Sequence, residues 1–386
     1  MPKLIRITTV PMALRYLLPG QMKYMKEQGF DVIMVSADGK EREEAIRNEG
    51  CPHIIVNMTR KITPFHDFFS FLKLVQLFKK HRPDIVHSHT PKAGLLAMLA
   101  AKMTGVSLRI HTIAGLRFMT SAGFTRNILV KMEKLTARAA THVWPNSNSL
   151  LKYIKEHKLV EGKKLEVIGH GSSNGINLQR YSMSSLKPER VREIKNLVNY
   201  DDKLIYLVSV GRIVKDKGID ELLKVFTRLY EKNNRLRLVL VGIFEEHLDP
   251  ITQDAREILI KHPAIIHIDW NDTVEYFMHI AYLLVHPSHR EGFPNVLLQA
   301  GAMECPVVCS RIEGNVDIVD HEVNGLVFES QNENDLEEKL NYALAQPTLM
   351  RNYSAKLRLK IEQHFDQQFV HEQLKAKYLQ LLGAGY

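Results

Sequence analysis

The stretch His289-Arg-Glu-Gly-Phe-Pro-Asn-Val-Leu-Leu-Gln299 decides the fold, because it joins a strand to a helix through a short turn. It follows the apolar run Ala281-Tyr-Leu-Leu-Val-His286, which is typical of a buried strand. A helix then begins near Pro294, since proline is favoured at the first helical position. The turn holds one acid, Glu291, and one flexible residue, Gly292. Free backbone N–H groups at such a turn can bind an anion or a ring of hydroxyls, which suits a phosphorylated, hydroxyl-rich ligand.

Similar apolar runs recur along the chain and alternate with segments of helical composition, such as Ala93–Met103 and Thr125–Ala140. In the first half we predict strands at Leu4–Val10, Asp31–Ser36, His53–Val56, Ile85–Ser88, Leu108–Thr112, His142–Pro145 and Leu165–Ile168. In the second half we predict strands at Leu204–Val210, Leu236–Val241, Ile265–Ile268, Tyr282–His286 and Val307–Ser310. The alternation predicts an α/β fold with parallel sheets covered on both faces, in which ligands bind at the carboxyl ends of the strands.

Two interruptions divide the chain of 386 residues, which is long enough for two domains. The segment Gly169-His-Gly-Ser-Ser-Asn-Gly175 is too rich in Gly and Ser for the interior of a helix or strand, and the polar residues 183–203 read as a connection. We therefore predict two doubly wound, Rossmann-like domains, over residues 1–182 and 183–364. The helical tail, residues 365–386, is expected to pack on the first domain.

The composition is ordinary for a globular protein, with 45% hydrophobic and 25% charged residues. No apolar run approaches the roughly 18 residues that a membrane-spanning helix needs, and the amino terminus lacks the layout of a signal peptide. Cys51, Cys305 and Cys309 form neither a CxxC pair nor a zinc-binding spacing. We expect buried free thiols and a cytoplasmic location.

The net charge of +9 is unevenly distributed along the chain. Residues 1–182 hold 28 Lys and Arg against 13 Asp and Glu, whereas residues 183–386 hold 24 against 30. A basic first half suits an anionic membrane surface or a polyanionic substrate, although ordinary solvated surface explains such an excess equally well. No recognition motif or pattern of stacking aromatics accompanies the charge, so nucleic acid is not expected as a partner.

The segment Val210-Gly-Arg-Ile-Val-Lys-Asp-Lys-Gly218 follows a predicted strand and carries two cations that could bind phosphate. Gly211 permits an unusual backbone, and the Arg212 guanidinium can donate two hydrogen bonds to phosphate oxygens. Lys217 adds a second positive charge, so the pair could hold a diphosphate and neutralise it as a leaving group. Taken alone, the segment is equally typical of a basic surface turn.

Histidines mark the ends of two other predicted strands. His111 ends one of them, where it could reach a ligand, although such a histidine is more often structural. His87, His89 and Lys92 lie at the end of another, and we take His89 and Lys92 as candidates for an acceptor or phosphate site. The two alternating histidines resemble a metal-binding pair, but no nearby carboxylate completes one, so no metal is expected.

The segment Arg60–Arg82 combines six Lys and Arg with one acid and many aromatic residues. On a helix, one face would carry Phe68, Leu72, Val75 and Phe78, while Ser70, Lys73 and Lys80 would lie away from it. One interpretation is a core helix that covers the sheet. Another is a membrane-docking helix whose remaining aromatics enter the lipid interface. Both hold if one edge of the helix is exposed.

Together these motifs resemble the GT-B glycosyltransferases of family 4, over nearly the whole chain. The carboxyl half carries the more specific set: Val210-Gly-Arg to Lys217-Gly, His286-Pro-Ser to Glu291-Gly-Phe-Pro, Gln299-Ala, Pro306-Val-Val to Gly314, and Asn324-Gly-Leu. The amino half is similar to the branch that builds bacterial capsular polysaccharide, O-antigen and lipid-linked oligosaccharides, through His87-Ser-His-Thr-Pro-Lys-Ala-Gly94, His111-Thr and Asn174-Gly-Ile-Asn. The resemblance implies two Rossmann-like domains that face each other across a cleft.

The resemblance also implies residue roles in a retaining transfer that needs neither metal nor cofactor. Glu291 would contact the donor sugar hydroxyls, Arg212 and Lys217 would bind the diphosphate, and His111 would assist at the sugar. The backbone that approaches sugar and phosphate would belong to Gly292, Phe293, Asn295 and Val296. The course implied is a front-face displacement, in which the leaving phosphate helps to deprotonate the acceptor hydroxyl and no protein nucleophile takes part.

The chain departs from the family pattern at three places. The second acid of the family, which grips the ribose, is Gln299 here, whose amide can still accept one hydroxyl bond. Many members have a Gly-Gly loop after the first strand, whereas this chain has Thr9-Val-Pro-Met-Ala-Leu14, in which Met12 and Ala13 are the candidate loop residues. The usual Gly-Asp-Gly after the second strand of the carboxyl domain is Gly242-Ile-Phe-Glu here.

We therefore expect a glycosyltransferase of bacterial surface-polysaccharide assembly, peripheral on the cytoplasmic face of the membrane. Its donor would be a UDP-sugar, with N-acetylhexosamine as a candidate, and its acceptor a saccharide linked to polyprenyl diphosphate. One alternative is a sugar-nucleotide epimerase, which would need acid and base groups that the motifs do not supply in pairs. Another is a non-catalytic sugar-nucleotide binding protein, against which the joint presence of Glu291, Arg212, Lys217 and His111 argues.

Overall fold

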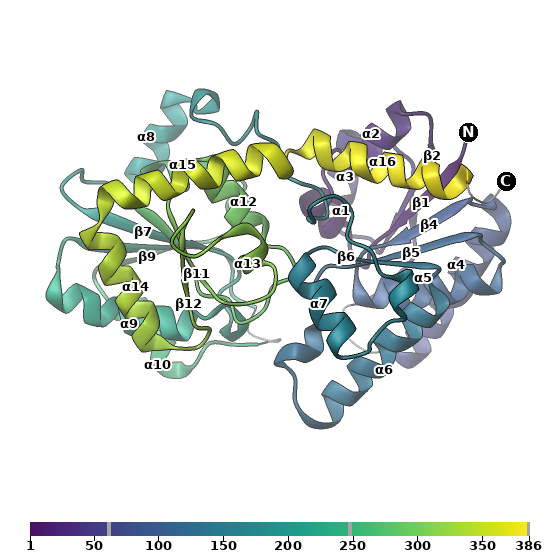
Figure 1. The fold of residues 1–386 in the computed structure, drawn as a ribbon, viewed down its shortest axis with the longest axis horizontal. Coiled ribbons are helices and arrows are strands. Elements are labelled where there is room, and N and C mark those ends of the chain that lie inside the picture. Colours follow the sequence, from purple (N-terminus) through teal and green to yellow (C-terminus); the bar gives the residue numbers. More distant parts are fainter. Residues whose placement is uncertain (60–62, 246–248, 384–386) are drawn as a thin grey trace. The chain divides into compact units, whose positions relative to one another are not determined.

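The computed structural model describes residues 1–59, 63–245 and 249–383, and these fall into two compact units (Figure 1). The first unit contains residues 1–175 together with the carboxyl-terminal helix α16 (Gln367–Gly383). The second unit is Ile176–Asp366. The change from one unit to the next lies directly after the Gly- and Ser-rich segment that ends at Gly175, whereas the sequence reading placed it after residue 182.

The first unit is built on a six-stranded parallel sheet with the order β3-β2-β1-β4-β5-β6. Its strands are β1 (Lys3–Ile7), β2 (Asp31–Ser36), β3 (His53–Ile55), β4 (Ile85–Ser88), β5 (Leu108–Ile113) and β6 (His142–Pro145). These strands are almost continuously apolar because both faces of the sheet are covered. Leu4 and Ile5 show the alternation, since they belong to core clusters on opposite faces.

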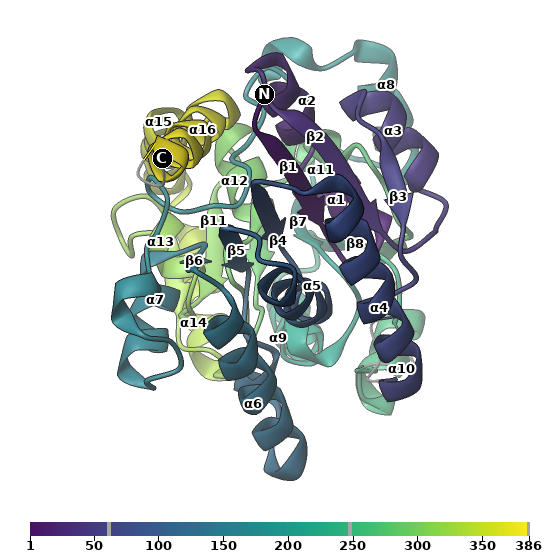
Figure 2. The same cartoon turned by 90° about the vertical axis from the view of Figure 1, so that its right-hand side faces the viewer.

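Helices cover both faces of this first sheet. One core cluster joins the sheet to α4 (Pro64–His81), α5 (Pro91–Met103), α6 (Gly123–Ala139) and α7 (Asn148–Glu156). The other joins it to α1 (Pro11–Leu17), α2 (Gln21–Glu27), α3 (Arg42–Glu49) and α16. Figure 2 shows α5 between α4 and α6, in agreement with the contacts among these three helices.

The second unit repeats the plan with the strand order β12-β11-β10-β7-β8-β9, again all parallel. Its strands are β7 (Ile205–Val210), β8 (Leu236–Val241), β9 (Ile265–Ile268), β10 (Leu283–His286), β11 (Val307–Ser310) and β12 (Leu326–Phe328). One face packs on α8 (Pro188–Leu197), α11 (Val274–Ile280), α12 (Asn295–Ala302), α13 (Asn315–Ile318) and α15 (Pro347–His364). The other packs on α9 (Ile219–Lys232), α10 (Gln253–Lys261) and α14 (Glu333–Ala345).

The predicted α/β class with two doubly wound sheets is confirmed, but two strand assignments were wrong. Leu165–Ile168 is not a strand, because Leu165 makes only an isolated bridge to Val143 at the edge of the first sheet. The three-residue strand β12 was missed, because three residues are too few to show a periodic pattern of apolar side chains.

The predicted orientation of α4 is also corrected. Val75 and Phe78 are buried as expected, but Phe68 and Leu72 are exposed, and Ser70 is buried with its hydroxyl donating to the His66 carbonyl at 3.0 Å. The helix is apolar nearly all round, so the spacing alone does not select the face that packs on the sheet. Arg60, Lys61 and Ile62 lie outside the described residues.

The three cysteines are buried free thiols, as predicted. Burial raises the pKa of Cys51 to about 11 and that of Cys305 to about 12. Within the described residues, no helix combines the length and the apolar character that a bilayer span requires.

Candidate active site

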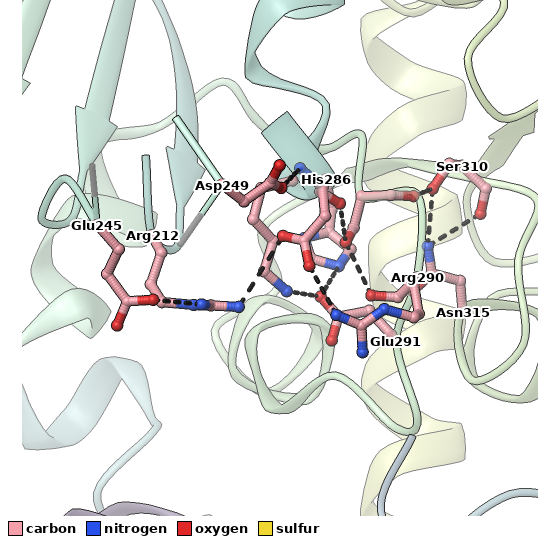
Figure 3. A network of polar contacts seen from close by, with 11 residues as sticks. Arg212, Glu245, Asp249, His286, Arg290, Glu291, Ser310 and Asn315 are labelled. Atoms are coloured by element: carbon pink, nitrogen blue, oxygen red, sulfur yellow. Dashed lines mark hydrogen bonds and ion pairs between the residues drawn. The ribbon is translucent and has the colours of Figure 1, made fainter. Parts of the chain in front are cut away.

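Glu291 lies in a network of polar contacts that also contains His286 and Arg290 (Figure 3). Its partner Lys217 meets it at the carboxyl edge of the second sheet. Glu291 lies in the turn between β10 and α12, and Lys217 ends a short 3₁₀ helix (Lys215–Lys217) that follows the neighbouring strand β7. The Lys217 ammonium donates to Glu291 Oε1, and His286 Nε2 lies 3.4 Å from the same oxygen. Two of the predicted site residues are therefore brought into direct contact.

The environment keeps Glu291 ionised. Burial alone would raise the pKa of this carboxyl, but the charge of Lys217 and the imidazole of His286 lower it well below its usual range. A carboxylate in this position accepts hydrogen bonds and donates none. The cluster can thus bind sugar hydroxyls at Glu291 while Lys217 presents a positive charge beside them.

Two glycines allow the chain to fold tightly around this pair. Gly218 has a φ of +68°, and a Cβ there would lie 2.1 Å from the Pro287 carbonyl oxygen. Gly314 has a φ of +83°, and its Cβ would lie 2.4 Å from the Gly292 carbonyl oxygen. A side chain at Gly218 would push the loop of Lys217 away from the segment after β10, and one at Gly314 would push the segment after β11 away from the Glu291 turn.

Arg212, the other predicted phosphate ligand, lies on the same loop as Lys217 but contacts acids. Its Nη1 donates to Glu245 Oε2 at 2.5 Å, and its Nη2 is 3.9 Å from Asp216 Oδ1. Burial would lower the pKa of Arg212, but the bond to Glu245 and the acidic neighbours raise it. Arg212 is therefore fully charged, and its side chain remains 38% exposed.

Asp216 fixes this loop against the Glu291 turn. Its side chain accepts from Arg290 Nη2 at 2.7 Å, and its carbonyl accepts from the backbone N–H of His289 at 2.8 Å. Its own backbone N–H donates to Asp249 Oδ2 at 2.7 Å. Asp216 thus ties three segments of the site together.

The remaining second-unit candidates surround the Glu291 turn. Asn295 and Val296 begin α12, where the first N–H groups lack partners within the helix, and Gly292 lies in the turn just before it. The Phe293 ring packs in the core, 5.1 Å from the ring of Phe365, so only its backbone can serve a ligand. Gln299 Nε2 donates to the hydroxyl of Tyr181 at 2.8 Å, and the Gln299 Oε1 oxygen is a hydrogen-bond acceptor.

In the first unit, His111 lies on β5 with its Nδ1 2.8 Å from the Ser88 hydroxyl on β4. Burial lowers the pKa of His111 to about 4, partly opposed by its bond to Ser88, so the ring is neutral at physiological pH. Gly94 makes room for the ring, because a Cβ there would lie 2.3 Å from His111 Cε1. His111 is therefore placed as a neutral hydrogen-bonding group.

The other first-unit candidates do not gather around an anion site. Lys92 donates to Asp67 Oδ1 at 2.7 Å, so its charge is already paired. His89 is buried, and neither ring nitrogen has a partner among the described residues. Met12 and Ala13 were expected in a loop but lie in the first turn of α1, because β1 ends at Ile7 and Pro11 starts the helix.

Several residues that shape the site were missed in the sequence. His286 ends the strand β10 and was quoted in a motif without a role, and Ser88 was quoted between two histidines, also without a role. Glu245 lies in the segment noted for its departure from the family pattern but was assigned no role, and Tyr181 lies 118 residues from its partner Gln299. Across the described part of the chain, no three His, Cys, Asp or Glu side chains gather in a way that could hold a metal ion.

Two doubly wound units, one with a Glu–Lys–Arg cluster at the edge of its sheet, are the architecture of the GT-B class of glycosyltransferases. Residues 21–180 match the pattern described as Glycosyltransferase Family 4, and residues 191–360 match that described as Glycosyl transferases group 1. The chain belongs to this family of glycosyltransferases, which confirms the resemblance seen in its motifs.

Three known proteins illustrate the relationship. The capsular polysaccharide biosynthesis glycosyltransferase CapM of Staphylococcus aureus is 34% identical over 97% of this chain and 96% of its own length. The N,N'-diacetylbacillosaminyl-diphospho-undecaprenol α-1,3-N-acetylgalactosaminyltransferase of Campylobacter jejuni is 25% identical over 83% and 84%. The structure of Anabaena Alr3699/HepE in complex with UDP-glucose superposes with a TM-score of 0.82 at 15% identity, covering 98% of this chain and 100% of that one.

Proposed function

We propose that this glycosyltransferase moves a sugar from a UDP-sugar to a saccharide carried on a polyprenyl diphosphate during assembly of a bacterial surface polysaccharide. The observation that carries the proposal is the contact between Glu291 and Lys217 beside Arg212. It combines an acceptor of sugar hydroxyl bonds with two cations suited to a diphosphate. The relatives from S. aureus and C. jejuni support the pathway and the lipid diphosphate carrier.

The proposed reaction retains the configuration at the anomeric carbon. The bond from that carbon to the diphosphate breaks while a bond to the acceptor hydroxyl oxygen forms on the same face. The proton of the acceptor hydroxyl passes to an oxygen of the leaving diphosphate, which Lys217 and Arg212 stabilise. Glu291 holds sugar hydroxyls in place, and the neutral imidazole of His111 assists at the sugar. Neither a metal nor a cofactor is part of the proposal.

An anionic membrane surface is the proposed place of action, on the cytoplasmic side. Phe65 and Phe69 in the first turns of α4 are 89% and 69% exposed, and Phe68 beside them is also exposed. Exposed Lys73, Lys79 and Lys80 continue along the same helix. Aromatic side chains flanked by lysines suit the interface of a negatively charged bilayer, where a lipid-linked acceptor resides.

The direct test of the reaction uses a panel of UDP-sugars with a synthetic polyprenyl-diphosphate saccharide. We expect transfer that depends on the acceptor, with an α-linked product from an α-linked donor. N-acetylhexosamine and hexose donors are compared, because the C. jejuni relative is named for an N-acetylgalactosamine transfer. Isomerisation of the UDP-sugar without acceptor would contradict the proposal and indicate an epimerase. Binding without any turnover would indicate a non-catalytic binding protein.

The membrane part is tested separately on vesicles. Phe65→Ser with Phe69→Ser should reduce binding to vesicles containing anionic lipid and leave binding of UDP unchanged. Ile260→Ser is the matched control, since Ile260 is equally exposed (69%) but lies in the second unit. If the wild-type protein does not bind anionic vesicles at low salt, the membrane part of the proposal is wrong.

A further inference from the structure

Glu245 belongs to the segment that follows β8, where this chain departs from the family pattern. Asp249 lies four positions later on the same segment, and residues 246–248 between them are outside the described part. Both carboxylates reach the loop Gly211–Lys217, which carries the two proposed diphosphate ligands.

Backbone contacts hold this segment tightly against the loop. The Ile213 N–H donates to the Ile243 carbonyl at 2.8 Å, and the Lys215 N–H donates to the Asp249 carbonyl at 3.1 Å. Gly242 has a φ of +152°, and a Cβ there would lie 1.8 Å from the Gly211 carbonyl oxygen. The position of Glu245 relative to Arg212 is therefore set by the backbone.

The two carboxylates act on different parts of the loop. Asp249 Oδ2 accepts from the backbone N–H of Asp216, so it stabilises the course of the chain. Glu245 Oε2 instead accepts from the side chain of Arg212 at 2.5 Å and is only slightly exposed itself. A carboxylate offers the Arg212 guanidinium the same kind of oxygen acceptors as a phosphate.

We propose that Glu245 is an internal stand-in for the donor diphosphate: it holds Arg212 in the empty site and gives it up when the diphosphate binds. The proposal rests on the proposed function, in which Arg212 binds that group. While the site is empty, Glu245 keeps the guanidinium ordered, which lowers the entropy cost of binding. Once the diphosphate has taken Arg212, the Glu245 carboxylate has lost this bond, and its recovery favours release of the nucleoside diphosphate product.

Glu245→Gln separates the charge from the structural contact, because the amide oxygen still accepts from Arg212. UDP is the probe, and its dissociation constant is measured by titration calorimetry. We expect the variant to bind UDP about three- to tenfold more tightly, the size of effect that corresponds to a displaced charge-assisted bond. Product inhibition by UDP should strengthen by a similar factor.

Two further variants make the result specific. In an Arg212→Ala background, Glu245→Gln should leave the UDP dissociation constant unchanged, since the competition acts through Arg212. Asp249→Asn should weaken UDP binding and lower the melting temperature, because it disturbs the loop itself. Thermal unfolding of each variant establishes that it is folded.

The outcomes separate this inference from the proposed function. Equal or weaker UDP binding by Glu245→Gln overturns the stand-in role, and so does a gain that persists without Arg212. If folded wild-type protein does not bind UDP at all, the proposed donor class is wrong, and the stand-in role falls with it.

Discussion

The two units have the same sheet plan but opposite chemistry at the carboxyl edges of their sheets. In the second unit, Glu291, Lys217 and Arg212 are all charged and engaged with partners of opposite sign. In the first unit, His111 and His89 are buried neutral rings beside hydroxyl-bearing residues such as Ser88. A shared fold therefore does not determine what an edge binds, because the side chains after each strand set its charge.

The difference matches the two partners of a sugar transfer. A diphosphate leaving group carries negative charge and requires compensating cations, whereas an acceptor hydroxyl is neutral and requires hydrogen bonds. Arg6 is the exception in the first unit: it is buried, and its Nη2 donates to Gln21 Oε1 at 2.5 Å. Burial lowers the pKa of His87 and of His89, and the charge of Arg6 lowers both further.

The largest expected effect concerns the charged edge. Lys217→Met should reduce the rate of transfer by about 100- to 1000-fold, because it removes a cation from the leaving diphosphate. The measurement is turnover with saturating UDP-sugar and acceptor. Lys224→Met is the matched control, since Lys224 lies on α9 in an exposed pair with Glu333 and should tolerate the change. A loss below about tenfold would show that the charge of the second edge does not carry the reaction.

Acidification should lower the folding stability of the first unit, whose buried histidines are neutral. His111 and His371 have a pKa of about 4 in the folded protein, against about 6.5 for an unfolded histidine. The unfolded chain therefore binds more protons between these values, and stability that is complete above about pH 6.5 is lost as the pH falls towards 4. Each of these two residues should cost the first unit about 2 kcal/mol between pH 7 and pH 5.

The two tryptophans allow the units to be followed separately. Trp144 is buried in the first unit beside His87, and Trp270 is in the second unit. Denaturant unfolding of a Trp270→Phe variant should shift to lower midpoints from pH 7 to pH 5, and that of a Trp144→Phe variant should shift less. The stabilising contribution of the lowered Glu291 pKa is lost only below about pH 4.5, so it does not interfere. Equal shifts for both probes would contradict the contrast between the edges.

Much of this architecture could be predicted from the sequence, because buried parallel strands leave long apolar runs. Asp31–Ser36, Leu236–Val241 and Val307–Ser310 have the predicted bounds in the structure. The errors lie where the pattern is weak. Leu165–Ile168 has the composition of a strand but pairs with the sheet through a single bridge. Apolar residues lie on several sides of α4, so their spacing does not identify the buried face.

The site, too, has residues that could be predicted from the sequence and residues that could not. Glu291 and Lys217 follow neighbouring strands, so their encounter follows from the topology. Arg212 and Glu245 also follow neighbouring strands, β7 and β8, but Glu245 was assigned no role because its segment departs from the family pattern. Met12 and Ala13 failed as loop residues because Pro11, a residue that often begins a helix, was read as part of the loop.

The next effect tests the geometry of the neutral edge. Gly94→Ala would place a Cβ 2.3 Å from His111 Cε1, so the ring has to move. We expect kcat to fall by about 10- to 100-fold while UDP binding, assigned to the second unit, is unchanged. Gly162→Ala is the matched control, since a Cβ there meets nothing within 4 Å. Unchanged kcat in a folded Gly94→Ala protein would contradict the proposed role of His111 in the reaction.

The smallest effect concerns Gln299, where the charged edge lacks the acid usual in the family. Burial raises the pKa of Tyr181 to about 12, so its hydroxyl stays protonated and can donate to a carboxylate placed at position 299. Gln299→Glu should therefore keep the contact with Tyr181 and offer a charged oxygen to the ribose. We expect the donor KM to fall about threefold to fivefold, close to 1 kcal/mol, with kcat unchanged. The measurement is donor KM at saturating acceptor, with Tyr181→Phe combined with Gln299→Glu as control. A rise in KM would mean that the added negative charge repels the diphosphate more than it binds the ribose. An uncharged side chain at position 299 would then favour donor binding.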